Sequence, residues 1–234
     1  MPVSIIIPVY NEESIVEENI KKLISFLDKQ EEKYEILVID NGSTDKTYEI
    51  GKKLEEKFRG KVRFFHIPKK GVGLAFKKAV ENALFEKLIS VDVDLTIDLN
   101  FIPECLKLLE ENSIVIGSKK VGKDSRSIVR KFISDTFIFM TRCLLRLKFS
   151  DYSIGAKGYI KSDIVNYLNY VDRGSFYVIP LTYFVKRKGK NIKEIPVVCF
   201  DKRKSRFNLL HEIFYRFKNL IIFWLKVKCL KSIR

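Results

Sequence analysis

The feature that most constrains the fold of this chain is the alternation of short apolar runs with amphipathic stretches over its first half. The apolar runs are rich in Val and Ile, as expected for strands buried on both faces. They occupy residues 3–9, 34–40, 61–67, 88–94 and 113–118. Stretches such as 11–27, whose apolar residues form one helical stripe, lie between them. This alternation predicts an α/β fold with a mostly parallel sheet and helices on both faces.

The pattern after residue 118 is less regular. The expected elements are a long basic helix (127–149), a strand or loop (151–160), a short helix (162–171), a further helix (176–189) and a strand (190–200). Ser162 is the predicted N-cap of the short helix, and the next helix accommodates Pro180.

The last segment, residues 207–234, has apolar residues spaced by threes and fours, with Lys and Arg around them. That spacing predicts an amphipathic helix. We therefore expect one main unit over residues 1–206, with halves 1–118 and 119–206, followed by this C-terminal helix.

The excess of positive charge is confined to two segments of the chain. There are 44 Lys and Arg against 29 Asp and Glu, a net charge of +15. Residues 118–150 hold nine basic and two acidic residues and residues 201–234 hold ten and two, whereas the remainder balances at 25 of each. This distribution predicts a localised anionic partner, which could be nucleic acid, a phosphorylated small molecule or an acidic lipid headgroup.

Several classes of protein do not fit the sequence. The start lacks the basic region and small-residue cleavage site of a signal peptide. The apolar run at 219–225 is far shorter than the roughly 20 residues of a membrane span. Cys105, Cys143, Cys199 and Cys229 have no metal-binding or redox spacing, so we expect reduced core thiols in a cytosolic protein.

Polar residues follow three of the predicted strands at the point where each strand ends. They are Tyr10, Asn11, Glu12, Asp40, Asn41, Asp92 and Asp94. Because the carboxyl ends of parallel strands share one edge of a sheet, we expect these side chains to converge. In a strand, Asp92 and Asp94 would point to the same face and repel each other. A hard divalent cation, with the phosphates that it bridges, would neutralise them.

Each of these motifs also has a simpler structural explanation. An Asp-x-Asp pair alone is a weak signal, because acidic residues commonly end strands. Ser43 and Thr44 fit a turn or helix N-cap. Gly71 and Gly73 lack the spacing of known phosphate loops, so a turn with close helix packing is the safer role for them.

Taken together and in order, the motifs resemble those of glycosyltransferase family 2. They are SIIIPVYNEE, VIDNGSTD, KKGVGLAFKKAVENA, VDVDL, VIGSKK and DYSIGAKGY, and the resemblance covers roughly residues 3–206. Within the family they are most similar to the dolichyl- or polyprenyl-phosphate sugar synthases. The resemblance implies a GT-A fold, a nucleotide-binding half at 1–118 and an acceptor half at 119–206. It also implies inverting transfer of a monosaccharide from GDP-mannose or UDP-glucose, or a similar donor, to a lipid phosphate.

The resemblance also implies roles for single residues. The nucleotide pocket would be lined by Pro8, Tyr10, Glu12, Asp40, Asn41, Gly71, Gly73 and Asp92, with Asp40 accepting a hydrogen bond from the base. Asp92 and Asp94 would hold Mg²⁺ or Mn²⁺ on the diphosphate. The acceptor phosphate would be bound by Lys119, Lys157, Arg203 and Arg206. Arg206 would also stabilise the departing nucleoside diphosphate.

The chain departs from the family pattern at four positions. Asn41 replaces the second aspartate after the second strand, and Thr96 replaces a frequent Gln near the metal. Lys119 and Lys157 replace arginines, which keeps the charge but loses the bidentate fork that suits phosphate. These changes leave open a catalytically weak relative.

The acceptor is inferred from an absent residue. Transfer to a sugar hydroxyl needs a general base, and residues 174–190 contain no acid; Asp172 is the nearest. A phosphate monoester is already ionised at neutral pH and needs only cations to hold it. Two alternatives remain open: transfer to a glycan or lipid-linked hydroxyl with Asp172 as base, and a basic nucleic-acid-binding protein. The second alternative does not explain the carboxylates at the strand ends.

The C-terminal helix 207–234 has the composition of a helix that lies in a membrane interface. Each cation near an acidic leaflet would contribute about 1 kcal/mol. We therefore expect peripheral attachment to the cytoplasmic face of a membrane. Packing of the apolar side on the main unit, or on the partner in a homodimer, is the alternative.

Overall fold

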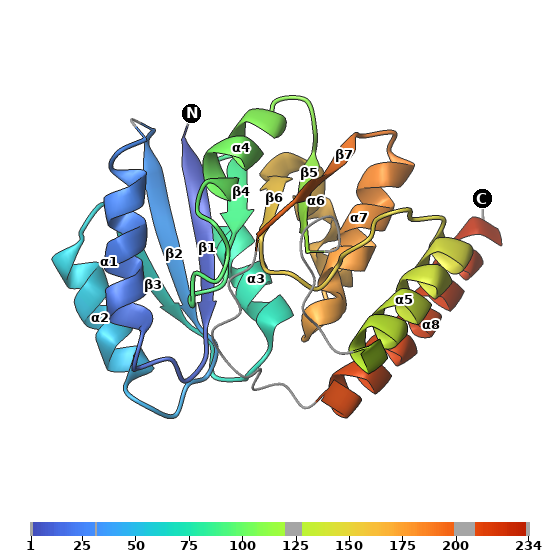
Figure 1. Ribbon diagram of the computed structural model, residues 1–234, viewed down its shortest axis with the longest axis horizontal. Coiled ribbons are helices and arrows are strands. Elements are labelled where there is room, and N and C mark those ends of the chain that lie inside the picture. The colour runs from blue at the N-terminus through green and yellow to red at the C-terminus, as the bar shows by residue number, and fades with distance from the viewer. Residues whose placement is uncertain (1, 31, 120–127, 199–208, 233–234) are drawn as a thin grey trace.

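The computed structural model describes residues 2–30, 32–119, 128–198 and 209–232 (Figure 1). A seven-stranded sheet runs through the centre in the order β3-β2-β1-β4-β6-β5-β7. Its strands are β1 (Val3–Val9), β2 (Tyr34–Asp40), β3 (Val62–His66), β4 (Lys87–Ser90), β5 (Ile114–Ser118), β6 (Lys157–Ile160) and β7 (Ile192–Pro196). All strands are parallel except β6, which is antiparallel to both β4 and β5. The predicted α/β class and mostly parallel sheet are confirmed.

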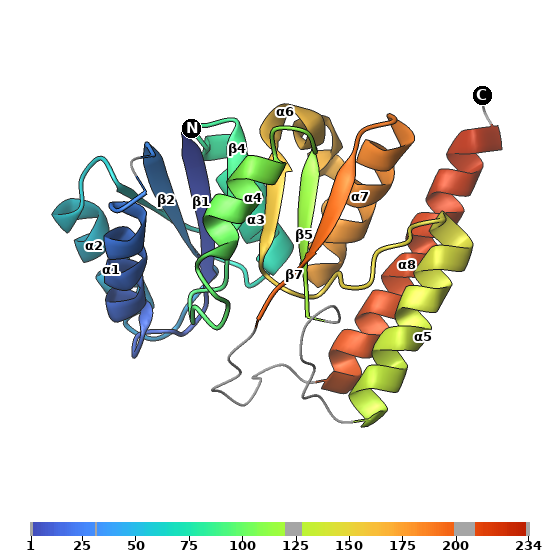
Figure 2. The same ribbon diagram turned by 45° about the horizontal axis from the view of Figure 1, so that its top comes forward.

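Helices cover both faces of the sheet (Figures 1 and 2). On one face lie α1 (Val16–Leu27), α2 (Thr47–Lys57) and α4 (Phe101–Leu108), which share a core cluster with the inward side chains of the strands. On the other face lie α3 (Val72–Asn82), α6 (Lys161–Ile164) and α7 (Val178–Arg187), around a second cluster. Short 3₁₀ segments, Val165–Tyr170 and Ser175–Tyr177, precede α7.

Two long helices pack side by side at one end of the molecule, beyond β7 and α7 (Figure 2). They are α5 (Ile128–Leu145) and α8 (Leu209–Ser232). The rings of Phe137 and Phe217 meet edge to face between them, with centroids 5.4 Å apart. Leu220, Phe223 and Val227 of α8 are buried in the same core cluster as the sheet. The C-terminal helix is therefore folded onto the rest of the protein.

Several sequence-based expectations are corrected in detail. The strand predicted over 88–94 ends at Ser90, because the chain turns at Asp92–Leu95. Ser162 does not cap α6, whose N-cap position is Ile160. The predicted core thiols are confirmed only for Cys105; Cys143 and Cys229 are exposed, and Cys199 lies outside the described residues.

Among the described residues, neither α8 nor any other helix combines the length and apolar character needed to cross a bilayer.

Candidate active site

The loops after β1 and β2 are tied together at the carboxyl edge of the sheet. Asn11 has a left-handed backbone conformation, with φ of 54°. Its side-chain oxygen accepts the Thr44 N–H at 2.7 Å, and its own N–H donates to the Ser43 hydroxyl at 2.9 Å. The N-cap role predicted for Ser43 and Thr44 is wrong, because α2 begins only at Thr47. These two residues instead join the two loops.

Asp40 ends β2 as a fully buried carboxylate. Its Oδ2 lies 2.7 Å from Nδ1 of His66, the last residue of the adjacent β3, and its Oδ1 accepts the Ser43 N–H at 3.1 Å. Both oxygens therefore have partners within the protein. The hydrogen bond from a nucleobase to Asp40 stays a prediction, and it would have to share an oxygen with one of these donors.

Gly71 and Gly73 pack tightly at the start of α3, as the simpler explanation predicted. The Gly71 N–H donates to Asn41 Oδ1 at 2.6 Å. A Cβ on Gly73 would lie 1.9 Å from the carbonyl oxygen of Asp172, and one on Gly71 would lie 2.6 Å from Arg173. Asn41 thus has a structural use, which the family's aspartate at that position could also serve. The nucleotide-binding roles of these residues stay predictions.

Three further residues of the predicted nucleotide pocket, Pro8, Tyr10 and Glu12, lie at the same edge and are half-buried. The Glu12 N–H donates to the Thr47 hydroxyl at 2.8 Å, which anchors the end of the β1 loop to α2. The ammonium of Lys70 lies 3.7 Å from the centre of the Tyr10 ring, a cation–π contact. Lys70 therefore places a positive charge beside the predicted nucleotide pocket, and the sequence motifs did not single out this residue.

Asp92 and Asp94 follow β4 in a tight turn. The Leu95 N–H bonds to the Asp92 carbonyl at 3.1 Å, Leu95 has φ of 46°, and the Thr96 N–H bonds to Asp94 Oδ1 at 3.2 Å. The strand geometry expected for the pair is therefore wrong. The two carboxyls remain close enough to repel, since the charge of Asp94 adds to the effect of burial in raising the pKa of Asp92.

Two lysines lie within electrostatic reach of Asp92. The Asp92 residue keeps access to solvent, yet the protein atoms around its carboxyl displace water and make the largest contribution to its raised pKa. The charges of Lys157 and Lys119 lower the pKa and so oppose this effect. Lys157 begins β6 and pairs with Ser90 at the end of β4. Because β6 runs antiparallel, its first residue lies at the edge where the parallel strands end. The structure thus brings together Asp92, Asp94, Lys119 and Lys157.

Lys157 is buried, and burial lowers the pKa of its ammonium to about 8, against the attraction of Asp151 and Asp92. Its Nζ donates to the carbonyl oxygen of Ile154. The role predicted for Lys157 in binding an acceptor phosphate is untested, and it would require an approach to this enclosed group. Arg203 and Arg206, the other predicted phosphate ligands, lie outside the described residues.

Asp151 and Glu194 are two site residues that the sequence did not single out. Asp151 is buried and accepts hydrogen bonds from the Ser153 N–H and hydroxyl at 2.8 and 2.7 Å and from the Lys119 N–H at 3.3 Å. Burial alone would raise its pKa, but the Ser153 bonds and the charge of Lys157 lower it overall. Glu194 of β7 accepts from Ser150 and Asp151. They are recognised only from the folded structure, in which Asp151 is buried and Glu194, which is half-buried, accepts hydrogen bonds from Ser150 and Asp151.

The segment at 172–177 and the helix α8 complete the site. Asp172 Oδ2 accepts the Gly174 N–H at 2.7 Å and the Tyr215 hydroxyl, whereas its buried Oδ1 has no hydrogen-bond partner among the described residues. Tyr177 is buried, and burial together with the charges of Asp92 and Asp172 raises its pKa. Packing of α8 on the main unit was the alternative to membrane attachment, but the sequence pattern does not predict the contact between Tyr215 and Asp172.

The carboxylate pair offers the hard oxygen donors that Mg²⁺ or Mn²⁺ prefers. Within the described ranges no three His, Cys, Asp or Glu side chains are grouped closely enough to hold a metal by themselves. Mg²⁺ commonly binds through one or two carboxylates and completes its ligands from substrate phosphates. The residues therefore fit a metal bound together with a diphosphate.

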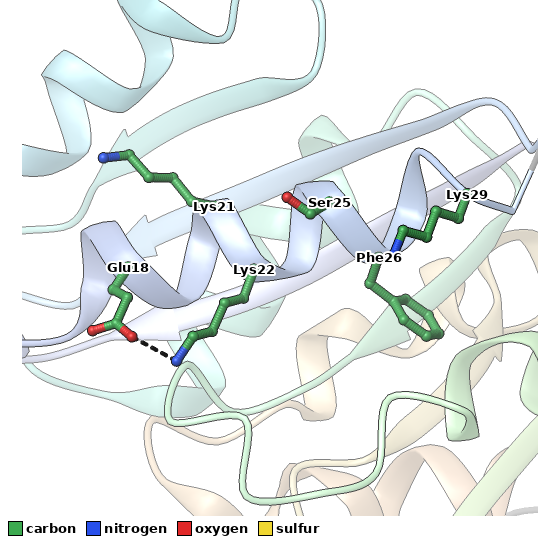
Figure 3. Close-up of a pocket in the computed structure, with 6 residues that line it drawn as sticks. All are labelled: Glu18, Lys21, Lys22, Ser25, Phe26 and Lys29. Carbon is green, nitrogen blue, oxygen red and sulfur yellow. Dashed lines mark ion pairs between the residues drawn. The ribbon is translucent and has the colours of Figure 1, made fainter.

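A surface hollow on the outer side of α1 is unrelated to these residues (Figure 3). It is lined by Glu18, Lys21, Lys22, Ser25, Phe26 and Lys29, and contains the 2.6 Å ion pair between Glu18 and Lys22. Exposed ion pairs of this kind contribute little to stability.

The family of the chain follows from its similarity to known proteins. The family model described as Glycosyl transferase family 2 matches residues 4–168. The chain belongs to glycosyltransferase family 2, as its motifs predicted. It is 30% identical over 204 residues to a dolichol-phosphate mannosyltransferase of Pyrococcus furiosus, covering 84% of this chain and 56% of the relative. It is 26% identical to an undecaprenyl-phosphate 4-deoxy-4-formamido-L-arabinose transferase of Edwardsiella ictaluri, covering 89% and 63%. The chain thus spans between half and two thirds of the length of these relatives.

Solved structures support the GT-A fold. Glucosyl-3-phosphoglycerate synthase from Mycobacterium tuberculosis, in complex with Mn²⁺ and UDP-glucose, matches with a TM-score of 0.68 at 16% identity, over 95% of this chain and 78% of that one. Mannosyl-3-phosphoglycerate synthase from Rubrobacter xylanophilus matches with a TM-score of 0.67 at 13% identity, over 97% and 75%. At these identities the likeness concerns the fold alone.

Proposed function

We propose that this protein transfers a monosaccharide, with inversion, from a nucleotide-diphosphate sugar to dolichyl or polyprenyl phosphate. The observation that carries the proposal is the grouping of Asp92, Asp94, Lys119 and Lys157 at the carboxyl edge of a family 2 sheet. The names of the two relatives described above, both of which act on a lipid phosphate, support this class of acceptor.

In the proposed mechanism Asp92 and Asp94 would hold Mg²⁺ or Mn²⁺, which would offset the charge of the donor diphosphate. The half-buried residues at the ends of β1 and β2, Tyr10 and Glu12 among them, would hold the nucleoside. Lys119 and Lys157 would orient the acceptor phosphate for in-line attack on the anomeric carbon. The new bond from the phosphate oxygen would form as the bond from this carbon to the donor diphosphate breaks, and the nucleoside diphosphate would leave. No general base is needed, because the phosphate oxygen is already ionised. The structure of a relative with Mn²⁺ and UDP-glucose supports the use of a divalent metal.

Membrane attachment is the second part of the proposal, and we propose a different surface for it from the one that the sequence suggested. The apolar residues of α8 predicted to face the membrane do not all lie on one side, since Phe217 and Trp224 pack against the core. Exposed apolar side chains lie elsewhere: Phe132 and Phe139 on α5, and Phe214, Ile221, Ile222 and Leu225 on α8. Lys218 and Lys226 are exposed beside them. We propose that α5 and α8 together attach to the cytoplasmic face of an acidic membrane. Covering of the same face in a homodimer is the alternative outcome.

Donor binding can be tested by thermal shift with UDP-glucose and GDP-mannose, with and without Mn²⁺. A donor that binds only the native state raises its stability by about 2.7 kcal/mol at a concentration of 100 times its Kd. We expect this rise to require Mn²⁺ and to be lost in Asp94→Asn. Asp98→Asn, an exposed carboxylate of the same loop, makes the same change of charge and should behave as wild type.

Product analysis with a radiolabelled donor tests the acceptor. We expect label in an organic-soluble polyprenyl phosphate sugar, and a preference for a short soluble sugar would overturn the proposal. Transfer to a hydroxyl remains the second candidate, because the buried Oδ1 of Asp172 has no hydrogen-bond partner among the described residues. In that case Asp172→Asn should abolish the chemical step. Salt-sensitive nucleic-acid binding without any donor binding would instead favour a nucleic-acid-binding protein.

A further inference from the structure

Two adjacent residues of α8, Tyr215 and Arg216, contact the segment before α7. The Tyr215 hydroxyl donates to Asp172 Oδ2 and accepts the Gly174 N–H at 3.0 Å. Arg216 Nε donates to the Ser175 hydroxyl oxygen at 3.1 Å. Side chains 41 residues away in sequence thus hold the backbone and side chains of this segment.

The opposite side of the segment packs against the start of α3. The Gly73 N–H donates to the Arg173 carbonyl at 3.1 Å. A Cβ on Gly73 would lie 1.9 Å from the Asp172 carbonyl oxygen, and a Cβ on Gly174 would lie 2.6 Å from the Tyr215 ring. Neither contact leaves room for a shift without moving backbone or an aromatic ring. The segment is therefore clamped between α3 and α8.

The clamped segment ends at Tyr177, a buried residue within electrostatic reach of Asp92. The Tyr177 ring stacks on Phe76 of α3, with centroids 4.6 Å apart. Its hydroxyl is within electrostatic reach of Asp92 and Asp172. Arg216 is in turn within reach of both Tyr177 and Lys157. A displacement of the segment would therefore change the surroundings of Asp92 and Lys157.

We propose that Tyr215 and Arg216 are positioning residues that hold residues 172–177 in place beside Asp92 and the start of α3. In this proposal α8 helps to position the site residues, in addition to its proposed role in membrane attachment. The proposal rests on the proposed function for its effect on sugar transfer, but the clamp itself can be measured without any substrate.

Hydrogen exchange of the intact chain, followed by mass spectrometry, tests the clamp. In Tyr215→Phe we expect peptides covering 171–177 and 72–76 to exchange about tenfold faster, as the loss of a hydrogen bond to a charged group predicts. Tyr170→Phe is the matched control. It removes a hydroxyl with no hydrogen bond among the described residues from a ring that also packs near α8. Ser175→Ala, which removes one acceptor of the Arg216 side chain without changing α8, should also accelerate exchange in the same peptides.

Unchanged exchange in Tyr215→Phe and Ser175→Ala would overturn the proposal. So would equal acceleration throughout α8 and the sheet, because that would show a general loss of stability. The second readout is kinetic: kcat/KM for transfer should fall about tenfold in Tyr215→Phe while vesicle binding stays unchanged. If local exchange accelerates but no transfer is found even in wild type, the clamp stands and the proposed function fails.

Discussion

At the scale of single residues, the geometry of the site depends on the absence of a Cβ atom at Gly155 as well as on the charged groups. Gly155 precedes β6 and lies directly beside Asp92: a Cβ there would lie 2.3–2.4 Å from the Asp92 carboxyl atoms. The Gly155 backbone N–H also helps to lower the pKa of that carboxyl. The glycine of the DYSIGAK motif therefore determines where the Asp92 carboxylate can point.

Gly155→Ala should displace the Asp92 carboxylate while leaving its chemistry intact. Because the obstructing atoms are the end of a side chain, we expect the protein to fold normally. Mn²⁺-dependent donor binding, measured by calorimetry, should weaken roughly 10- to 100-fold, as for other residues that orient metal ligands. Gly158→Ala is a useful comparison, because its Cβ would meet Cys105 and Leu109 in the core. That variant should lose stability instead, and equal donor binding in the two variants would contradict the prediction.

Lys157 predicts a specific dependence of stability on pH. Its pKa falls from 10.5 in the unfolded chain to about 8 in the folded protein. Between these values the unfolded state binds more protons, so stability rises as pH increases from about 8 to about 10.5. Below pH 8 both states are protonated, and the buried charge costs about 3 kcal/mol. The free energy of unfolding of wild type minus that of Lys157→Met should therefore increase over this range. A difference that stays flat would show that the ammonium is not buried as described.

At the scale of elements, the loops after β1 and β2 form one unit, because Asn11 bonds to both Ser43 and Thr44. The motif explained why polar residues occur at these strand ends. The turn geometry decides which of these residues are free to bind a ligand and which bond to each other. The positive φ of Asn11 is the clearest feature of that geometry.

Replacing Asn11 separates these contributions. Asn11→Ala loses the bond to the Thr44 N–H and places an alanine at φ 54°, so we expect a loss of about 2 kcal/mol in the free energy of unfolding. Asn11→Gly also loses the side-chain bonds to Thr44 but tolerates the positive φ, so it should cost less, about 1 kcal/mol. Urea denaturation measures both values. Equal losses in the two variants would mean that the backbone conformation is not strained for alanine.

At the scale of the whole molecule, α8 is a structural element of the core. Phe223 is 5% exposed, and its ring lies 5.4–6.5 Å from those of Tyr170, Phe176, Tyr183 and Phe184. Phe214, on the same helix, is 75% exposed. One face of α8 is therefore packed in the core, where it contributes to stability, and the other face is exposed to solvent.

Two substitutions distinguish these faces. Phe223→Ala should lower the free energy of unfolding by about 3–5 kcal/mol, because it leaves a cavity among aromatic rings. Phe214→Ala should change it by less than about 0.5 kcal/mol, while it weakens sedimentation with acidic vesicles. Thermal unfolding checks the first value and vesicle sedimentation the second. Similar stability of the two variants would contradict the packing of α8.

The sequence by itself determined the α/β class, the positions of most strands and the family, because burial on both faces and strand-end motifs are local properties of the chain. It also led us to predict Asp92, Asp94, Lys119 and Lys157 as site residues; the structure places the last three within electrostatic reach of Asp92, and the roles of all four stay predictions. Only the tertiary structure revealed Asp151, Glu194, Tyr177, Tyr215 and Arg216 as neighbours of that site. Their roles depend on the antiparallel insertion of β6 and on the packing of α8, which are contacts between segments far apart in sequence. No local periodicity encodes such contacts, because the same apolar helix face can pack against a sheet, a partner subunit or a membrane.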